Sequence, residues 1–227
     1  MLVDDSFLKT LSGKIPKITF GSNSGDWRLW HTKNAVSIER RNSIHELKNE
    51  HIMGEHNFSN LSASFLMAIS ICPKQEKQIR NAAETFRPTE NRSSWKSIKN
   101  KKIFLDAYNA NPSSMSTALQ SFVKYISLEK IKLDEVLFIL GDMNELGEHA
   151  EKLHSEVGML LKKLGASRVV FIGRYSQFYR EGFGDGCRCY AVKQEYEKDW
   201  QNDFDGAGYF FIKGSRSLQL ESLIAIT

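Results

Sequence analysis

The order of apolar and polar residues changes character along the chain, and the first fifty residues have the pattern of strands. Short apolar runs alternate with turn residues, and they predict strands at residues 27–31, 35–40 and 45–53, joined as antiparallel hairpins. A shorter run, Lys17–Phe20, ends at Gly21 and adds one more strand. We therefore expect a small, mostly antiparallel sheet in this part of the chain.

Residues 54–86 have the period of helices. After Gly54, apolar side chains recur at three and four residues, which predicts a buried helical face. That face is made by Phe58, Leu61, Phe65, Ala68 and Ile69. A second helix is predicted over 75–86, and its inward side chains are Ile79, Ala82, Ala83 and Phe86. Pro88 ends it, because proline disfavours helical conformation in the residue before it.

From about residue 93, predicted strands alternate with predicted helices. The strands are at 103–105, 136–140, 168–173 and 209–213. One helix begins at Asn111, a capping residue, with Pro112 at its first position. A second is expected over 148–164, and a short helix over 218–226. The inward positions of the two longer helices are Met115, Ala118, Leu119, Phe122, Ile126, and then Ala150, Leu153, Val157, Leu160, Leu161, Leu164.

This alternation predicts an α/β fold, a Rossmann-like and mostly parallel sheet with helices on both faces. The smaller α+β part precedes it. We therefore expect two domains, residues 1–90 and residues 91–227.

Charge and composition exclude several classes of protein. A net charge of +4 is small for a nucleic-acid binder, and we interpret the basic stretch Lys96–Lys102 as a solvated hairpin or linker. No apolar run approaches the ~20 residues that cross a membrane, and no signal peptide is visible, so a cytoplasmic location is expected. Cys187 and Cys189 share one face of a strand and lack further metal ligands nearby in sequence. We interpret them as reduced structural thiols.

Polar turns follow three of the predicted strands, at the ends where parallel sheets bind ligands. They are "DAYNANP" (106–112), "GDMNELG" (141–147) and "KGSR" (213–216). Asp142 could orient a cation or an ammonium group, or it could, with Asn144, only stabilise its turn. Lys213 and Arg216 flank a helix start whose N–H groups favour anions, a weak signal alone.

Two histidines follow the second of these turns. His149 and His154 are five residues apart, so they do not share one helical face. Their spacing is not that of the H-E-x-x-H zinc motif. We interpret them as surface or packing residues, and no metal site is predicted from the residues.

Taken in order, these turns strongly resemble the C-terminal domain of the Mur ligases. The matching stretches are "DAYNANPSSM" (106–115), "LGDMNELGEHAEKLHSEVG" (140–158) and "FFIKGSRSLQLE" (210–221). Upstream, "MGEHNFSNLSASFLMAI" (53–69) resembles a helix of the family's central ATPase domain, and "TENR" (89–92) resembles the turn between the two domains. "LVDDSFL" and "KITFG" also resemble the central domain. The resemblance covers nearly the whole chain and is greatest to members that add D-alanyl-D-alanine to a UDP-N-acetylmuramoyl tripeptide.

The resemblance implies peptide-bond formation in two steps, with ATP and Mg²⁺ as cofactors. ATP phosphorylates the tripeptide's carboxylate, and the amine of D-alanyl-D-alanine then attacks the acyl phosphate. On the nucleotide side, the resemblance assigns Asn57 and Asn60 to adenine, Arg92 to the phosphates and Asp106 to the ribose hydroxyls. Between the nucleotide and the dipeptide it assigns Tyr108, Asn109 and Asn111. On the dipeptide side it assigns Asp142, Glu145, Lys213, Ser215 and Arg216.

The phosphate loop of this family, G-x-x-x-x-G-K-[ST], is missing from the sequence. The one Gly-Lys pair, Gly13-Lys14, is followed by Ile15, and Leu8 stands five residues before Gly13. The loop supplies the main contacts to the nucleotide phosphates, so we expect no ligase activity from this chain alone.

Three hypotheses on function stay open. The chain could be a binding or regulatory module for D-alanyl-D-alanine or another peptidoglycan-precursor fragment. It could be half of a split ligase completed by a chain that carries the loop, or a fragment of a longer enzyme. Because a central-domain sheet without its neighbouring strands would expose an edge, we expect a homo-oligomer, such as a dimer, or a partner chain to cover it.

Overall fold

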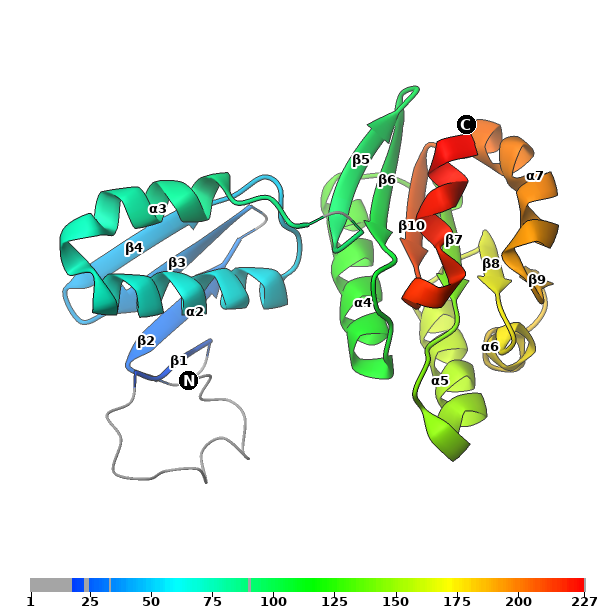
Figure 1. The fold of residues 1–227 in the computed structure, drawn as a ribbon, viewed down its shortest axis with the longest axis horizontal. Coiled ribbons are helices and arrows are strands. Elements are labelled where there is room, and N and C mark those ends of the chain that lie inside the picture. Colours follow the sequence, from blue (N-terminus) through cyan, green and yellow to red (C-terminus); the bar gives the residue numbers. More distant parts are fainter. Residues whose placement is uncertain (1–17, 23–24, 33, 90, 227) are drawn as a thin grey trace. The chain divides into compact units, whose positions relative to one another are not determined.

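The chain forms two compact units, Met1–Arg87 and Pro88–Thr227, which are described separately (Figure 1). The computed structural model describes residues 18–22, 25–32, 34–89 and 91–226. The stretch "LVDDSFL", the Gly13-Lys14 pair, Lys17 of "KITFG" and Glu90 of "TENR" lie outside the described residues.

The first unit contains a four-stranded sheet. Its strands are β1 (Phe20–Gly21), β2 (Trp27–His31), β3 (Ala35–Arg40) and β4 (Ser43–Lys48), in that spatial order. β1 is parallel to β2, and the other pairs are antiparallel, as the sequence predicts for β2 and β3.

The predicted strand at 45–53 was wrong in its bounds, because β4 begins at Ser43 and ends at Lys48. The next residue, Asn49, is buried, and its N–H donates to the Asn34 carbonyl at 3.0 Å. Its side-chain amide donates to the carbonyls of Ala83 and Phe86, both at 2.9 Å. Asn49 therefore connects the end of β4 to residues 83–86.

Two helices, α2 (Glu55–Ile71) and α3 (Glu76–Thr85), follow the sheet, with the 3₁₀ turn η1 (Pro73–Gln75) between them. The helices and the sheet share one core, made by Phe20, Trp27, Leu29, Val36, Ile38, Leu47, Ile52, Phe58, Leu61, Phe65, Leu66 and Ala83. Ala82 and Phe86 are exposed, contrary to the prediction. Phe86 adopts an extended conformation after the helix ends, so its ring leaves the helical face and is 50% exposed.

The second unit contains a six-stranded sheet in the order β5 (Ser94–Ile98), β6 (Lys101–Asp106), β10 (Tyr209–Lys213), β7 (Val136–Gly141), β8 (Val169–Ile172), β9 (Cys187–Tyr190). All neighbours are parallel except β5, which pairs antiparallel with β6. The predicted mostly parallel α/β fold is confirmed.

The basic stretch 96–102 is a hairpin, as one of its two interpretations predicted. Lys99 and Asn100 connect β5 to β6, and both have positive φ, 45° and 66°. That conformation is typical of the two-residue turns that match strand twist.

Helices cover both faces of this sheet (Figure 1). α4 (Pro112–Leu128), α5 (Ala150–Lys163) and α6 (Ser176–Phe183) cover one face, where Phe122 contacts the rings of Phe104, Phe138 and Phe211. α7 (Lys193–Gly206) and the 3₁₀ segment η5 (Leu220–Ile226) cover the other. The second core is made by Ile103, Leu105, Ala107, Leu137, Ile139, Val170, Ile172, Tyr196, Trp200, Phe204, Ala207, Phe210, Ile212, Leu220 and Leu223.

Several elements of the second unit differ from the prediction. The sequence pattern predicted neither α6 nor α7. α5 begins at Ala150, two residues later than expected, because Gly147–His149 form a 3₁₀ turn (η3). The closing helix is two 3₁₀ segments, η4 (Arg216–Leu218) and η5, separated by Gln219 in the left-handed conformation. A further 3₁₀ turn, η2 (Leu133–Glu135), precedes β7.

Glycines allow α5 and α6 to pack closely. A Cβ atom added at Gly158 would lie 2.1 Å from the Tyr179 carbonyl oxygen, and one at Gly182 would lie 1.9 Å from that of Ser155. Across residues 18–226, wherever the structure describes the chain, no helix is long and apolar enough to cross a membrane.

Candidate functional site

The residues of interest gather where the parallel strands of the second unit end. β6, β10, β7 and β8 are consecutive neighbours in the sheet, so the turns after them lie side by side. We call these turns (residues 106–111, 142–147, 173–176 and 213–217) the carboxyl edge. Parallel sheets bind ligands at such an edge.

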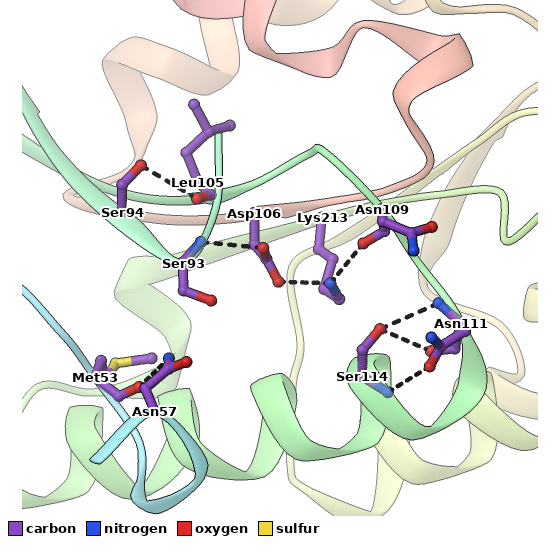
Figure 2. Close-up of polar contacts among 10 residues, drawn as sticks. All are labelled: Met53, Asn57, Ser93, Ser94, Leu105, Asp106, Asn109, Asn111, Ser114 and Lys213. Carbon is purple, nitrogen blue, oxygen red and sulfur yellow. Dashed lines mark hydrogen bonds and ion pairs between the residues drawn. The ribbon is translucent and has the colours of Figure 1, made fainter. Parts of the chain in front are cut away.

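An ion pair between Asp106 and Lys213 links the ends of β6 and β10 (Figure 2). The Lys213 ammonium lies 2.5 Å from one Asp106 carboxylate oxygen and donates to the Asn109 carbonyl at 3.0 Å. The other Asp106 oxygen accepts from the Ser93 N–H at 3.0 Å. Lys213 is only 1% exposed. The family resemblance assigns Asp106 and Lys213 to different ligands, and the structure brings them together.

Asn111 begins α4 in the predicted way. Its side-chain oxygen accepts from the Ser114 N–H at 2.8 Å, and the Ser114 hydroxyl accepts from the Asn111 N–H at 3.1 Å (Figure 2). This reciprocal pair is a capping box. The Asn111 side chain therefore has a structural role here, whereas the side chain of Asn109 is exposed at the same turn.

Arg92 and Tyr108 form a stacked pair at the same end of β6. The guanidinium carbon of Arg92 lies 3.7 Å from the centroid of the Tyr108 ring, within cation–π range. The Tyr108 N–H donates to the Asn91 carbonyl at 3.1 Å. Both side chains are exposed, with Tyr108 at 45%. The pair presents a flat cation to solvent, and guanidinium groups suit phosphate oxygens.

Asp142 follows β7 and connects it to the end of β8. Its carboxylate accepts from the N–H groups of Arg174 at 2.8 Å and Tyr175 at 3.0 Å. Gly173 lies against it, since a Cβ there would be 2.4 Å from the carboxylate. Burial raises the pKa of Asp142, although these two N–H bonds and the charge of Arg174 favour its ionised form.

Hydrogen bonds also tie the turn after β7 to the turn after β10. The Ser215 hydroxyl accepts from the Asn144 N–H at 3.0 Å, and the Ser215 N–H donates to the Asp142 carbonyl at 2.9 Å. The Asn144 side chain donates to the Ser217 hydroxyl at 2.9 Å. Ser215 is buried, so its hydroxyl acts within the protein here.

Glu145 and Arg216 present charge outward from these two tied turns. Glu145 is exposed and has a positive φ of 62°, which is uncommon for a residue with a side chain. Arg216 is exposed and pairs with Glu221. A carboxylate and a guanidinium therefore flank the Asn144–Ser215 contact in sequence.

The two adenine candidates lie in the first unit, on α2. Asn57 is half-buried, and its side-chain amide donates to the Met53 carbonyl at 2.7 Å (Figure 2). Asn60 is exposed, one turn further along the helix.

The described residues contain no group of three or more His, Cys, Asp or Glu side chains placed to hold a metal ion. Arg92 and Asp106 have the chemistry to contact phosphates and hydroxyls, but both Asp106 oxygens already accept hydrogen bonds. These groups therefore suit contacts to a nucleotide better than they suit Mg²⁺.

His154 was interpreted from the sequence as a surface or packing residue, and its contact with the site was not predicted. His154 is completely buried and contacts the turn after β7. It shares a helical face with Ala150, Val157 and Leu161, all of them buried. That spacing was the available signal, because a polar residue within an apolar stripe must find partners inside the protein.

Comparison with known proteins gives the class. Residues 91–202 match the family described as "Mur ligase, glutamate ligase domain". A crystal structure of MurF from Acinetobacter baumannii superposes with a TM-score of 0.77 at 22% identity, covering 92% of this chain and 46% of that one. The MurF ligase from Thermotoga maritima gives 0.65 at 19% identity over 92% of this chain and 47% of that one. The chain belongs to the Mur ligase family, and its second unit is a Mur ligase C-terminal domain.

Its curated relatives are UDP-N-acetylmuramoyl-tripeptide–D-alanyl-D-alanine ligases. The protein from Treponema pallidum is 31% identical over 176 residues, 75% of this chain and 36% of the relative. The protein from Rickettsia prowazekii is 25% identical over 169 residues, 74% of this chain and 36% of the relative. The match thus extends over little more than a third of either relative's length.

Proposed function

We propose that this chain binds D-alanyl-D-alanine, or a peptidoglycan-precursor peptide that ends in it, at the carboxyl edge of the second unit. We further propose that these 227 residues do not catalyse ATP-dependent ligation alone. The relatives' names supply the substrate class. The turns after β7 and β10, which are joined by hydrogen bonds, present Glu145 and Arg216 as charged groups that could receive the two ends of a dipeptide.

A dipeptide is a zwitterion, so its site must receive an ammonium and a carboxylate. Glu145 offers an exposed carboxylate from one turn and Arg216 an exposed guanidinium from the other. The Asn144–Ser215 hydrogen bond of 3.0 Å holds the two turns together. A bound carboxylate would replace Glu221 as the partner of Arg216, and charge-assisted contacts of this kind are the stronger hydrogen bonds in proteins.

The proposed inactivity rests on the missing phosphate loop. In phosphoryl transfer, the protein contributes mainly positioning and charge stabilisation, and the loop with its lysine supplies both at the phosphates. In the second unit, Arg92 remains as an exposed contact for nucleotide phosphates. We expect ATP to bind weakly and without turnover. The role is placed in the cytoplasm, where the family resemblance implies precursor assembly.

Calorimetry with D-alanyl-D-alanine tests the binding proposal. Glu145→Gln and Arg216→Gln should each weaken binding about tenfold, as expected for the loss of one charge-assisted contact. Lys163→Gln is the matched control, because Lys163 is exposed in the last turn of α5, at the opposite end of the helix from the turn after β7. L-alanyl-L-alanine serves as the stereochemical control. Absence of dipeptide binding at millimolar concentration would refute the proposal.

A ligase assay with the tripeptide precursor, ATP and Mg²⁺ tests the second part. We expect no ADP above background from the purified chain. Product formation by the pure chain would show that another group replaces the phosphate loop.

A second candidate function is one half of a split ligase, completed by a chain that carries the loop. The observation in its favour is the partial span of the relatives. In addition, β2 and β4 place Trp30 and Ile44 on the sheet with exposures of 52% and 69%, surface that a partner chain or a second copy would bury. Affinity capture from the native cytoplasm with quantitative mass spectrometry should recover a phosphate-loop protein. Light scattering tests the alternative of a homodimer, and a strict monomer would contradict it.

A further inference from the structure

The buried histidine of α5 holds the turn after β7 by two hydrogen bonds to backbone groups. His154 Nδ1 lies 2.6 Å from the Ala150 carbonyl oxygen, and the Met143 N–H donates to His154 Nε2 at 3.0 Å. His154 and Met143 are both 0% exposed. Met143 is the residue between Asp142 and Asn144, so the contact lies at the base of the turn.

These partners fix the protonation state of the ring. A carbonyl can only accept a hydrogen bond, so Nδ1 carries the proton and donates to Ala150. A backbone N–H can only donate, so Nε2 must be bare to accept from Met143. A doubly protonated imidazolium would set an N–H against the N–H of Met143. Protonation of His154 is therefore incompatible with this contact.

The surroundings favour the neutral ring. Tyr175 stacks on His154 with a centroid distance of 4.6 Å, and Tyr179 meets it edge-on at 4.7 Å. The Asp142 carboxylate is the charged group that faces it. Burial lowers the pKa of His154, while the bond to Ala150 and the charge of Asp142 act in the opposite direction.

We propose that His154 is the positioning residue of the turn 142–147, and that its neutral form sets the conformation in which this turn receives a ligand. The inference rests on the proposed function for the identity of that ligand. Loss of the Met143 contact would leave a buried N–H without a partner, which costs the desolvation of that group. The turn would shift to satisfy it, and Asn144 and Glu145 would move away from the turn after β10.

The coupling predicts an acid-sensitive turn. A pKa lowered in the folded state means that the unfolded chain binds more protons just below its own value of 6.5. Stability is then fully present above pH 6.5 and falls as the pH drops through the window below it. Asp142 has a raised pKa in the folded state, so its effect on stability has the opposite sign. It adds stability as the pH falls toward 3.8, the ordinary pKa of an aspartate.

Two substitutions of His154 test the inference on the full chain. His154→Gln keeps an acceptor and a donor within reach of the two backbone groups, whereas His154→Leu fills the space with neither. His149→Gln is the matched control, because His149 is an exposed histidine just before the same helix. The readouts are the amide exchange rate and chemical shift of Met143, the affinity for D-alanyl-D-alanine, and the unfolding midpoint from pH 7.5 to 5.

We expect His154→Leu to speed exchange at Met143 about tenfold relative to core amides of β7, and to weaken dipeptide binding about tenfold. His154→Gln should recover most of both. The wild type and His149→Gln should lose stability below pH 6.5, and His154→Leu should lose that dependence.

Unchanged Met143 exchange in His154→Leu, or a Met143 resonance that does not move with pH in the wild type, would overturn the inference. Failure of the wild type to bind the dipeptide, with the Met143 changes present, would refute the proposed function and leave the positioning role supported.

Discussion

Removal of the Lys213 ammonium should destabilise the second unit more than any single surface substitution. Lys213→Met keeps most of the stem and removes the charge, which leaves the Asp106 carboxylate with the Ser93 N–H as its remaining described partner. The side chains are 1% and 14% exposed. Breaking one side of a buried pair costs roughly 3–5 kcal/mol, and the partial exposure of Asp106 favours the lower end, about 3 kcal/mol.

That cost is large against the 5–15 kcal/mol that typically stabilises a domain. The double variant Asp106→Asn, Lys213→Met removes both charges, so it should cost clearly less than the sum of the single variants. The difference measures the coupling between the two side chains. Replacing Asp106 alone with asparagine leaves a buried ammonium held by the Asn109 carbonyl, and it should cost about as much as Lys213→Met.

Urea unfolding monitored by circular dichroism gives the free energy of unfolding of each variant, provided that its dependence on urea concentration has the same slope in all of them. Amide exchange rates in β6 report the stability of the second unit, and those in β3 report the stability of the first. Only the rates in β6 should change. Lys152→Met removes an exposed ion pair with Glu156 and should cost less than ~1 kcal/mol. A cost for Lys213→Met no larger than that of the control, or additive costs in the double variant, would refute the reasoning.

Three further predictions concern packing, capping and thiol chemistry. Gly158→Ala should destabilise the chain by about 1–3 kcal/mol, because its Cβ would meet a carbonyl of α6, whereas Gly208→Ala, with open space around it, should be nearly neutral in thermal unfolding. Asn111→Ala should cost about 1 kcal/mol through loss of the capping box, and a changed unfolding slope would point to another cause. A thiol reagent at pH 8 should modify exposed Cys72 first, because burial raises the pKa of Cys189 to about 12; equal rates would contradict this.

The fold followed from the sequence where local signals were strong. Asn111 and Pro112 predict the start of α4, and the apolar run 136–140 predicts β7, because helix caps and continuous apolar strands are local features of the sequence. α7 was missed although Tyr196, Trp200 and Phe204 recur at four residues, since the polar residues between them masked the period. The edge strand β5 was not predicted as a strand, and its residues from Lys96 onward were interpreted as a hairpin or linker, because its half-buried residues lack a clean alternation.

The sequence predicts that the polar turns lie at the carboxyl ends of the strands, but not which of their side chains contact one another. The strand ends identified Asp106 and Asp142, because ligand turns follow parallel strands. The Asp106–Lys213 pair joins residues 107 positions apart, and no local pattern encodes such a contact. The same holds for His154, whose role depends on which backbone groups the fold places against its ring.

The bonds across the carboxyl edge mean that the geometry of this surface exists before any ligand arrives. The side chains of Asp106, Lys213, Asp142 and Ser215 already have partners within the protein, so a ligand would have little conformational entropy to remove from them. Association should then resemble lock-and-key binding, with tight and weak ligands differing mainly in how fast they leave. Selectivity would fall to the few groups that still face water, and these could change during evolution without loosening the surface that presents them.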